Sequence, residues 1–118
     1  MITKATATLR FLVPKRVTYS NMGKIYVGQT KLRIVRTCNV DITGATARKI
    51  KYIKPSGTAG ELTATELTAA TGDIYFDVVS TTTVDEPGSW ITWAYVTFSD
   101  GRSAAGEPVI MKVYVEGT

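Results

Sequence analysis

Apolar and polar residues alternate along short stretches of this chain, and glycine, proline and aspartate recur between the stretches. Alternation with a period of two is typical of a strand with one buried face, because successive side chains point to opposite sides. The clearest stretches are residues 73–80, 89–99 and 108–116, and residues 31–37 and 47–54 alternate imperfectly. Turn residues lie at 42–44, 55–57, 87–88 and 100–101. Such spacing predicts about seven or eight strands and an all-β fold, an immunoglobulin-like antiparallel β-sandwich.

Two further stretches are less regular. Residues 61–70 suit either a short helix or an edge strand, and their threonine content with a Gly-Asp ending favours the strand. Residues 5–13 place Leu9, Phe11 and Val13 on one side until Pro14 ends ladder pairing. This N-terminal stretch is therefore predicted to be a strand or an extended arm.

Both faces of residues 90–98 are largely apolar, so the buried face has to be assigned. An aromatic residue near the start of such a strand packs inward in immunoglobulin-type sandwiches, which places Trp90 inside. The side chains expected to share the core with it are Ala94, Val96, Phe98, Val109, Met111, Val113 and Val115.

The residues that alternate with these core positions leave a group of apolar side chains on the outer face of the sheet. Exposed patches of this kind mark interfaces, and aromatic residues dominate binding energies there. The candidate interface residues are Ile91, Trp93, Tyr95, Ile110 and Tyr114, together with Leu9, Phe11 and Val13 of the N-terminal stretch. Three coverings of the outer group stay open, namely the N-terminal stretch of the same molecule, another protein chain, or a sugar stacked on Trp93.

The chain has 118 residues, which suits one domain, and it contains no histidine and one cysteine. This composition excludes an imidazole base, an imidazole metal ligand, a Cys-His pair and an internal disulfide. The acids at 85–86 and at 73 and 77 match no calcium loop and are expected to be solvated. We therefore expect no enzymatic activity, no catalytic residue, no cofactor and no metal, and we expect Cys38 to be a small buried apolar residue.

Charge is distributed unevenly between the two halves of the chain. Residues 1–59 hold twelve lysines and arginines against one acid, and residues 60–118 hold two against nine. Such asymmetry fits opposite charges facing each other across neighbouring strands, pairing between identical subunits, or a basic surface for nucleic acid. The first explanation is the simplest, and a nucleic-acid partner is not expected.

The N-terminal stretch lacks the apolar core of a secretory signal, and no run of residues is long and apolar enough to span a bilayer. The lone cysteine agrees with synthesis in a reducing cytoplasm. The sequence therefore predicts a soluble protein without a membrane partner.

The segments YVGQT, VDITGATARKIKYIKPSGT, TGDIYFDV, PGSWITWAYVTFSDGR and GEPVIMKVYV occur in this order between residues 25 and 115. This order resembles a small immunoglobulin-like module of tailed-bacteriophage virions, similar to N-terminal domains of baseplate upper proteins and to modules on capsids and tails. The chain departs from that pattern in the 24 residues before Ile25 and in the second tryptophan, Trp93.

The resemblance implies a non-enzymatic structural protein of a virion, made in the host bacterial cytoplasm. Residues 1–24 would form an arm or an extra strand, and residues 25–118 the sandwich domain. The implied partners are capsid, neck, tail or baseplate proteins and further copies of the chain in a homo-oligomer. The alternative is a virion-exposed, adhesin-like module that binds a host surface glycan.

Overall fold

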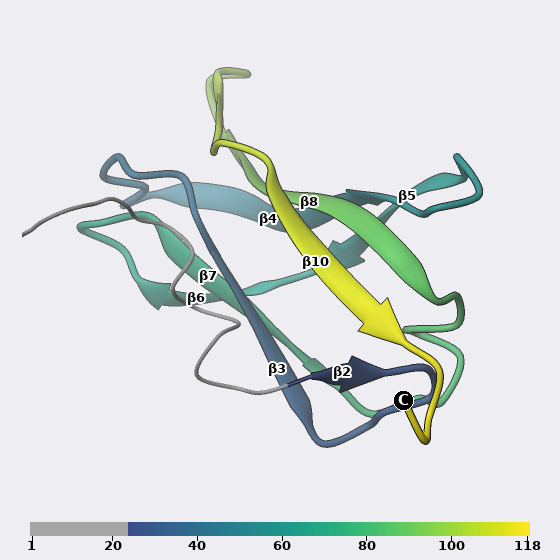
Figure 1. The fold of residues 1–118 in the computed structure, drawn as a ribbon. Helices are drawn as coiled ribbons and strands as arrows, with labels where there is room; N and C mark the ends of the chain where they lie inside the picture. The colour runs from purple at the N-terminus through teal and green to yellow at the C-terminus, as the bar shows by residue number, and fades with distance from the viewer. Residues whose placement is uncertain (1–23) are drawn as a thin grey trace, which may run out of the picture.

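The computed structural model describes residues 24–118, and every strand in this range belongs to one of two packed sheets. The strands are β2 (Ile25–Tyr26), β3 (Leu32–Thr37), β4 (Ala45–Ile53), β5 (Ala59–Thr63), β6 (Thr65–Thr68), β7 (Asp73–Val78), β8 (Gly88–Phe98), β9 (Ser103–Ala105) and β10 (Val109–Tyr114). The predicted all-β sandwich is confirmed (Figure 1). Residues 24–118 contain no helix of the length and apolarity that a membrane crossing requires.

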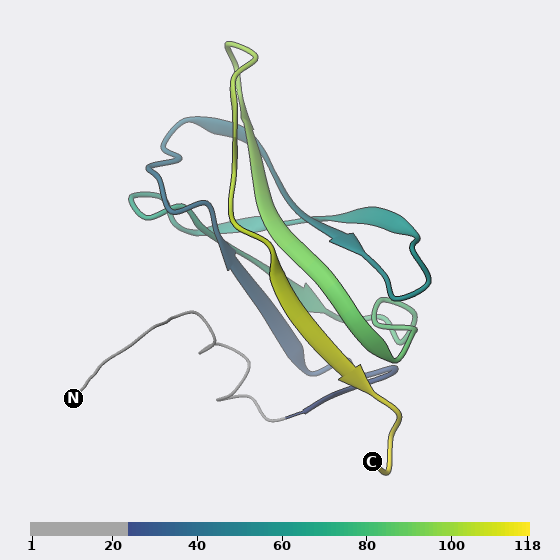
Figure 2. The same cartoon turned by 45° about the horizontal axis from the view of Figure 1, so that its top comes forward.

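The larger sheet has the order β2-β10-β8-β4-β5, and β9 pairs with β8 beyond the end of β10. The smaller sheet has the order β3-β7-β6. Neighbouring strands are antiparallel except β2 and β10, which pair in parallel over two residues. Figure 2 shows β10 beside β8 in one layer, β3 in the other, and the β8–β9 hairpin extending from the body of the domain.

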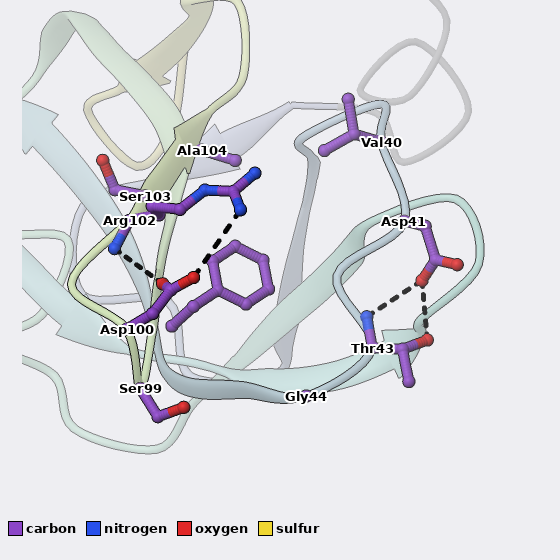
Figure 3. Close-up of a pocket in the computed structure, with 10 residues that line it drawn as sticks. Val40, Asp41, Thr43, Gly44, Ser99, Asp100, Arg102, Ser103 and Ala104 are labelled. Carbon is purple, nitrogen blue, oxygen red and sulfur yellow. Dashed lines mark hydrogen bonds and ion pairs between the residues drawn. The ribbon is translucent and has the colours of Figure 1, made fainter.

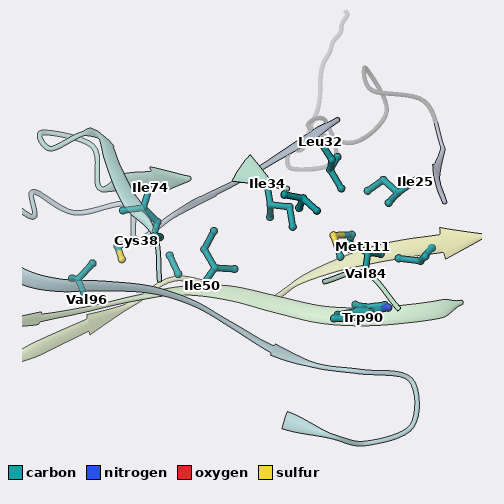
Figure 4. Packing of buried hydrophobic residues seen from close by; sticks show 14 of the residues in the cluster. Ile25, Leu32, Ile34, Cys38, Ile50, Ile74, Val84, Trp90, Val96 and Met111 are labelled. Atoms are coloured by element: carbon teal, nitrogen blue, oxygen red, sulfur yellow. The ribbon is translucent and has the colours of Figure 1, made fainter. Parts of the chain in front are cut away.

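The core fills the space between the two sheets, and its side chains come from the alternate residues that the sequence pattern indicates (Figure 4). Ile34 and Ile74 of the small sheet meet Ile50, Trp90 and Val96 of the large one. Trp90 is 2% exposed, its indole Nε1 donates to the Glu86 carbonyl at 2.9 Å, and its ring lies 5.3 Å from that of Tyr52. The indole is therefore buried with its polar atom paired.

Turns lie where glycine and proline predict them. The carbonyl of Ile42 accepts from the Ala45 amide, and the Lys54 carbonyl accepts from the Gly57 amide. Gly44, Gly57 and Gly101 all have positive φ, the backbone region that glycine adopts without a steric penalty. Residues 61–70 form the end of β5 and the whole of β6, so the preference for strand over helix is confirmed.

Two details differ from the sequence-based expectation. Val115, expected in the core, is 54% exposed because β10 ends at Tyr114 and the chain turns away. The sequence pattern also did not indicate β2 or β9, which are two and three residues long and too short for a periodic signal. The predicted strand or arm at residues 5–13, and with it most of the predicted segment 1–24, lies outside the described residues.

Candidate functional site

The outward face of β8 carries the apolar side chains that the alternation predicts. Trp90, Ala94 and Val96 are buried, whereas Ile91 is 39% exposed and Trp93 and Tyr95 are half-buried on the opposite side. The strand is covered on its inner face by the small sheet, and nothing in residues 24–118 forms a layer over its outer face. Trp93 therefore points away from the core.

Strand register extends this face across three strands. Ile91 of β8 lies opposite Ile110 of β10 on one side and opposite Ile53 of β4 on the other. Directly opposed residues share a face of the sheet and lie about 5 Å apart, so the three isoleucines form one continuous row. Ile110 is 55% exposed. We call Ile53, Ile91, Trp93, Tyr95 and Ile110 the outer apolar cluster.

Lysines of β4 and β10 border this cluster. Lys51 lies opposite Trp93 in the register and places its Nζ 3.9 Å from the centre of the Tyr95 ring. Lys49 lies opposite Tyr95 and pairs with Glu61 of β5, with 3.4 Å between Nζ and Oε2. Lys112 shares the face through its alternation with Ile110. The cluster thus has an apolar centre and a mainly cationic border.

The structure places the predicted interface residues in three situations. Ile91, Trp93, Tyr95 and Ile110 come together in the cluster. Tyr114 lies on the same face at the far end of β10, beyond Lys112, where its ring is 6.5 Å from that of Tyr26 and Lys24 Nζ is 4.7 Å from its centre. Leu9, Phe11 and Val13 lie outside the described residues, and whether any predicted residue forms an interface stays a prediction.

Sequence reasoning missed Ile53. The residue belongs to an alternation in which Ile50 faces inward while Lys51 and Ile53 face outward. Two lysines in that alternation made the outer side look like an ordinary solvated face. Only the pairing of Ile53 with Ile91 reveals the row, and pairing partners are not visible in a single strand.

An open pocket of about 540 Å³ lies between the β3–β4 loop and the β8–β9 hairpin (Figure 3). Asp41 Oδ1 accepts from the Thr43 amide at 2.9 Å and from its hydroxyl at 2.6 Å, and these bonds lower the pKa of the Asp41 carboxyl. On the other wall, Asp100 Oδ1 accepts from the Arg102 amide at 2.9 Å. Each carboxylate therefore holds its own loop, which accounts for both acids without a ligand.

Ion pairs explain much of the charge asymmetry between the halves of the chain. In residues 24–118, four ion pairs join a base of the first half to an acid of the second: Arg33–Asp77, Arg48–Glu66, Lys49–Glu61 and Lys54–Asp85. The Arg33–Asp77 pair is bidentate at 2.7 and 2.9 Å, and it lowers the pKa of the Asp77 carboxyl. Opposite charges therefore face each other between segments distant in sequence, as the simplest explanation predicts.

Metal-binding chemistry has little basis in the described part of the chain. No group of three or more histidine, cysteine, aspartate or glutamate side chains that would suit a metal ion occurs there. Cys38 is 4% exposed, and burial raises the pKa of its thiol. Since the thiolate is the reactive and metal-binding form, Cys38 acts as a small apolar core residue.

Comparison with known proteins gives one informative result. No protein-family model and no curated protein matches the chain. Among solved structures, the crystal structure of CopC from Methylosinus trichosporium OB3b is similar with a TM-score of 0.51 and 16% identity, over 84% of this chain and 91% of CopC. At this identity the likeness concerns the fold.

The comparison contradicts the predicted place of this chain in virions. The matching structure is CopC and not a phage module, and no family match supports the resemblance. The predicted roles as a virion structural protein and as a virion-exposed adhesin, and the virion localisation, were therefore wrong. The physical reason is that the quoted segments are turn residues and alternating strands, which any sandwich of this kind requires.

Proposed function

We propose that this chain is a non-enzymatic module that associates with a second copy of itself through the outer apolar cluster. The in-register row of Ile110, Ile91 and Ile53 carries the proposal. Three aliphatic side chains on adjacent strands, flanked by Trp93 and Tyr95, form a flat apolar surface. Contiguous apolar surface with aromatic residues at its centre is typical of protein interfaces.

The geometry of the row favours a twofold contact. Ile91 stands at its centre, with one isoleucine on each side. A twofold axis through Ile91 brings the row against its own copy, so that the same surface serves both subunits, as closed dimers require. Trp93 and Tyr95 then extend the buried area along β8 on both sides of the axis.

The lysine border sets how such an association responds to salt. Lys49, Lys51 and Lys112 outnumber Glu61 on this face, so two copies bring like charges near each other at the edge of the contact. Salt screens repulsion between exposed charges. Self-association should therefore strengthen as ionic strength rises, whereas binding to an acidic partner would weaken.

A non-enzymatic role is supported by the side chains available. The sequence contains no histidine, and the two carboxylates of the pocket between the β3–β4 loop and the β8–β9 hairpin are engaged by their own loops. General acid-base catalysis needs a group with a pKa near the working pH, but the lowered pKa of Asp41 lies further from neutrality. Binding through a sheet face requires none of these groups.

The test is sedimentation equilibrium of the full chain and of the variant Ile110→Glu, from about 10 μM to about 1 mM. The wild type should form dimers, and the new carboxylate in the row should weaken dimerisation by at least about 30-fold. Val79→Glu is the matched control, because Val79 is 82% exposed on the loop after β7, away from the outer face. This variant should dimerise like the wild type.

Two results would overturn the proposed self-association, and a third would overturn its twofold geometry. One is a wild-type chain that stays monomeric throughout the concentration range in both low and high salt. The other is a dimer that Val79→Glu and Ile110→Glu weaken equally. A dimer that dissociates as salt is added would contradict the twofold contact through a lysine-bordered face.

A further inference from the structure

The outer face of the large sheet carries lysine and aromatic side chains at both of its ends. At one end, Trp93 and Tyr95 of β8 lie opposite Lys51 and Lys49 of β4 in the register. The Lys51 ammonium lies 3.9 Å from the centre of the Tyr95 ring. All four side chains are half-buried, so parts of the rings and of the lysines are accessible. This end therefore offers two rings beside two cations.

The other end of the face has the same kinds of side chain. Tyr26 of β2 and Tyr114 of β10 are register partners, and their ring centres lie 6.5 Å apart. Lys24 Nζ lies 4.7 Å from the centre of the Tyr114 ring and donates to the Thr118 carbonyl. Lys112 is exposed two residues before Tyr114, on the same side of β10. Rings and cations therefore occur together at both ends.

The positive charge of this face results from placement and not from composition. Residues 24–118 contain ten lysines and arginines and ten aspartates and glutamates, so this part of the chain is neutral overall. Among the outward residues of the large-sheet strands in this range, Lys49, Lys51 and Lys112 stand against one acid, Glu61. The face therefore has a positive potential, which attracts anionic partners.

The isoleucine row separates the two groups of rings. Tyr114 lies four residues from Ile110, and Tyr95 lies four residues from Ile91, the register partner of Ile110. At about 3.3 Å per residue, the two groups are about 26 Å apart along the strands. This length suits several nucleotides of an extended single strand, because single-strand sites on small β domains cover about 4 to 16 nucleotides.

We propose that this face binds a single-stranded nucleic acid, with bases stacked on the accessible parts of the rings and phosphates near the lysines. A cation beside a ring suits a nucleotide, whose charged phosphate and planar base lie next to each other. A duplex keeps its bases stacked on one another and leaves none for the rings. The distribution of charge along the chain did not favour such a partner, because it does not show which lysines share a face.

The inference goes beyond the proposed dimer and does not rest on it. Nucleic acid and a second copy require the same face, so each should displace the other. Their responses to the loss of a lysine are opposite. Lys112→Gln removes repulsion between two copies and also removes attraction for phosphate. This substitution should therefore strengthen dimerisation and weaken binding of nucleic acid, which separates the two proposals.

The test is fluorescence anisotropy of a labelled oligothymidine of about ten nucleotides, titrated with the full chain at about 50 mM salt. The wild type should bind with a dissociation constant of about 1 to 100 μM that rises with salt. Trp93→Ser should weaken binding at least about tenfold, because it removes a stacking ring. Tyr75→Ser is the matched control, since Tyr75 is a half-buried ring beside Arg33 on the outer face of the other sheet. This variant should bind like the wild type.

Two further probes separate stacking from charge attraction, to which four basic residues in the segment 1–23 also contribute. Heparin carries charge without bases, and a duplex of equal length carries bases that are already stacked. Both should bind at least about tenfold more weakly than the oligothymidine. Equal binding of heparin, equal effects of Trp93→Ser and Tyr75→Ser, or no binding at about 100 μM protein would overturn the proposal. A monomeric chain that binds the oligothymidine would uphold it and remove the dimer.

Discussion

Arg36 of β3 donates from its guanidinium Nε to the hydroxyl oxygen of Thr92 on β8, across the space between the two sheets, at 2.7 Å. Arg36 is 7% exposed and Thr92 is 2% exposed. The threonine hydroxyl in turn donates to the Val109 carbonyl of β10 at 3.2 Å. A polar link in an otherwise apolar interior thus connects the small sheet to two strands of the large one.

Thr92→Val should destabilise the domain by about 1 to 3 kcal/mol, because it removes the oxygen that accepts from Arg36 while keeping the shape of the side chain. Urea unfolding at neutral pH measures the effect. Thr92→Ser keeps the hydroxyl and is the matched control, with a smaller loss from the missing methyl group. Equal losses in the two variants would show that packing, and not the hydroxyl, is what matters at this position.

Substitution of the two tryptophans of β8 should destabilise the domain to very different extents. Trp90→Ala empties a core site and should cost about 3 to 5 kcal/mol of the free energy of unfolding. Trp93→Ser changes a half-buried outward side chain and should cost under about 1 kcal/mol in the monomer. Thermal melts at low protein concentration make the comparison. A Trp93 variant that melts like the Trp90 variant would show that the outer face is covered within the same molecule.

Gly106→Ala should be strongly destabilising for a steric reason. A Cβ on Gly106 would overlap the Thr37 carbonyl oxygen and lie 3.4 Å from the Cys38 Cα. Relief requires the backbone between β9 and β10 to move and the Gly106 amide to lose its 2.9 Å bond to the Ala94 carbonyl. Chemical unfolding should show a loss of about 2 kcal/mol or more. Gly101→Ala meets no atom within 4 Å and should cost only about 1 kcal/mol for its positive φ of 88°.

The Arg33–Asp77 pair should contribute to stability in a pH-dependent way. The arginine lowers the pKa of Asp77 below the value of about 3.9 that the group has in an unfolded chain. A lowered folded-state pKa gives stability that is present above the unfolded value and is lost as the pH falls through the folded value. Asp77→Asn should therefore be less stable than the wild type at pH 6, and the difference should shrink as the pH is lowered below about 4. A difference that is constant down to pH 2 would exclude this linkage.

The alternation of single strands carried most of the fold prediction. In β8 and β10 it identified Trp90, Val96, Met111 and Val113 as inward residues. Alternation is informative in this way because assigning one side chain of a strand to the core fixes the direction of all the others. The same alternation found four members of the outer apolar cluster. Glycine and proline located the turns through their backbone preferences.

Pairing between strands was beyond the reach of a single sequence. Ile53 joins the isoleucine row only because β4 lies beside β8 in one particular register. β9 and β10 follow each other along the same side of β8, and Gly106 between them lies against the Thr37 carbonyl. Both features arise from contacts between segments distant in the chain. The phage resemblance failed for a related reason, since turn motifs describe the hairpins of a sandwich and not its biological role.

The parallel pairing of β2 with β10 has a mechanical consequence. The amide of Val27 donates to the Tyr114 carbonyl, and Lys24 Nζ donates to the carbonyl of Thr118, so the first and last described segments run side by side in the same direction. Tension applied between Lys24 and Thr118 pulls the two strands lengthwise past each other and loads their hydrogen bonds together. Pulling apart the two free ends of an antiparallel hairpin such as β8–β9 would instead break its hydrogen bonds one after another. The domain should therefore resist stretching between Lys24 and Thr118 more than the two-residue pairing of β2 with β10 suggests.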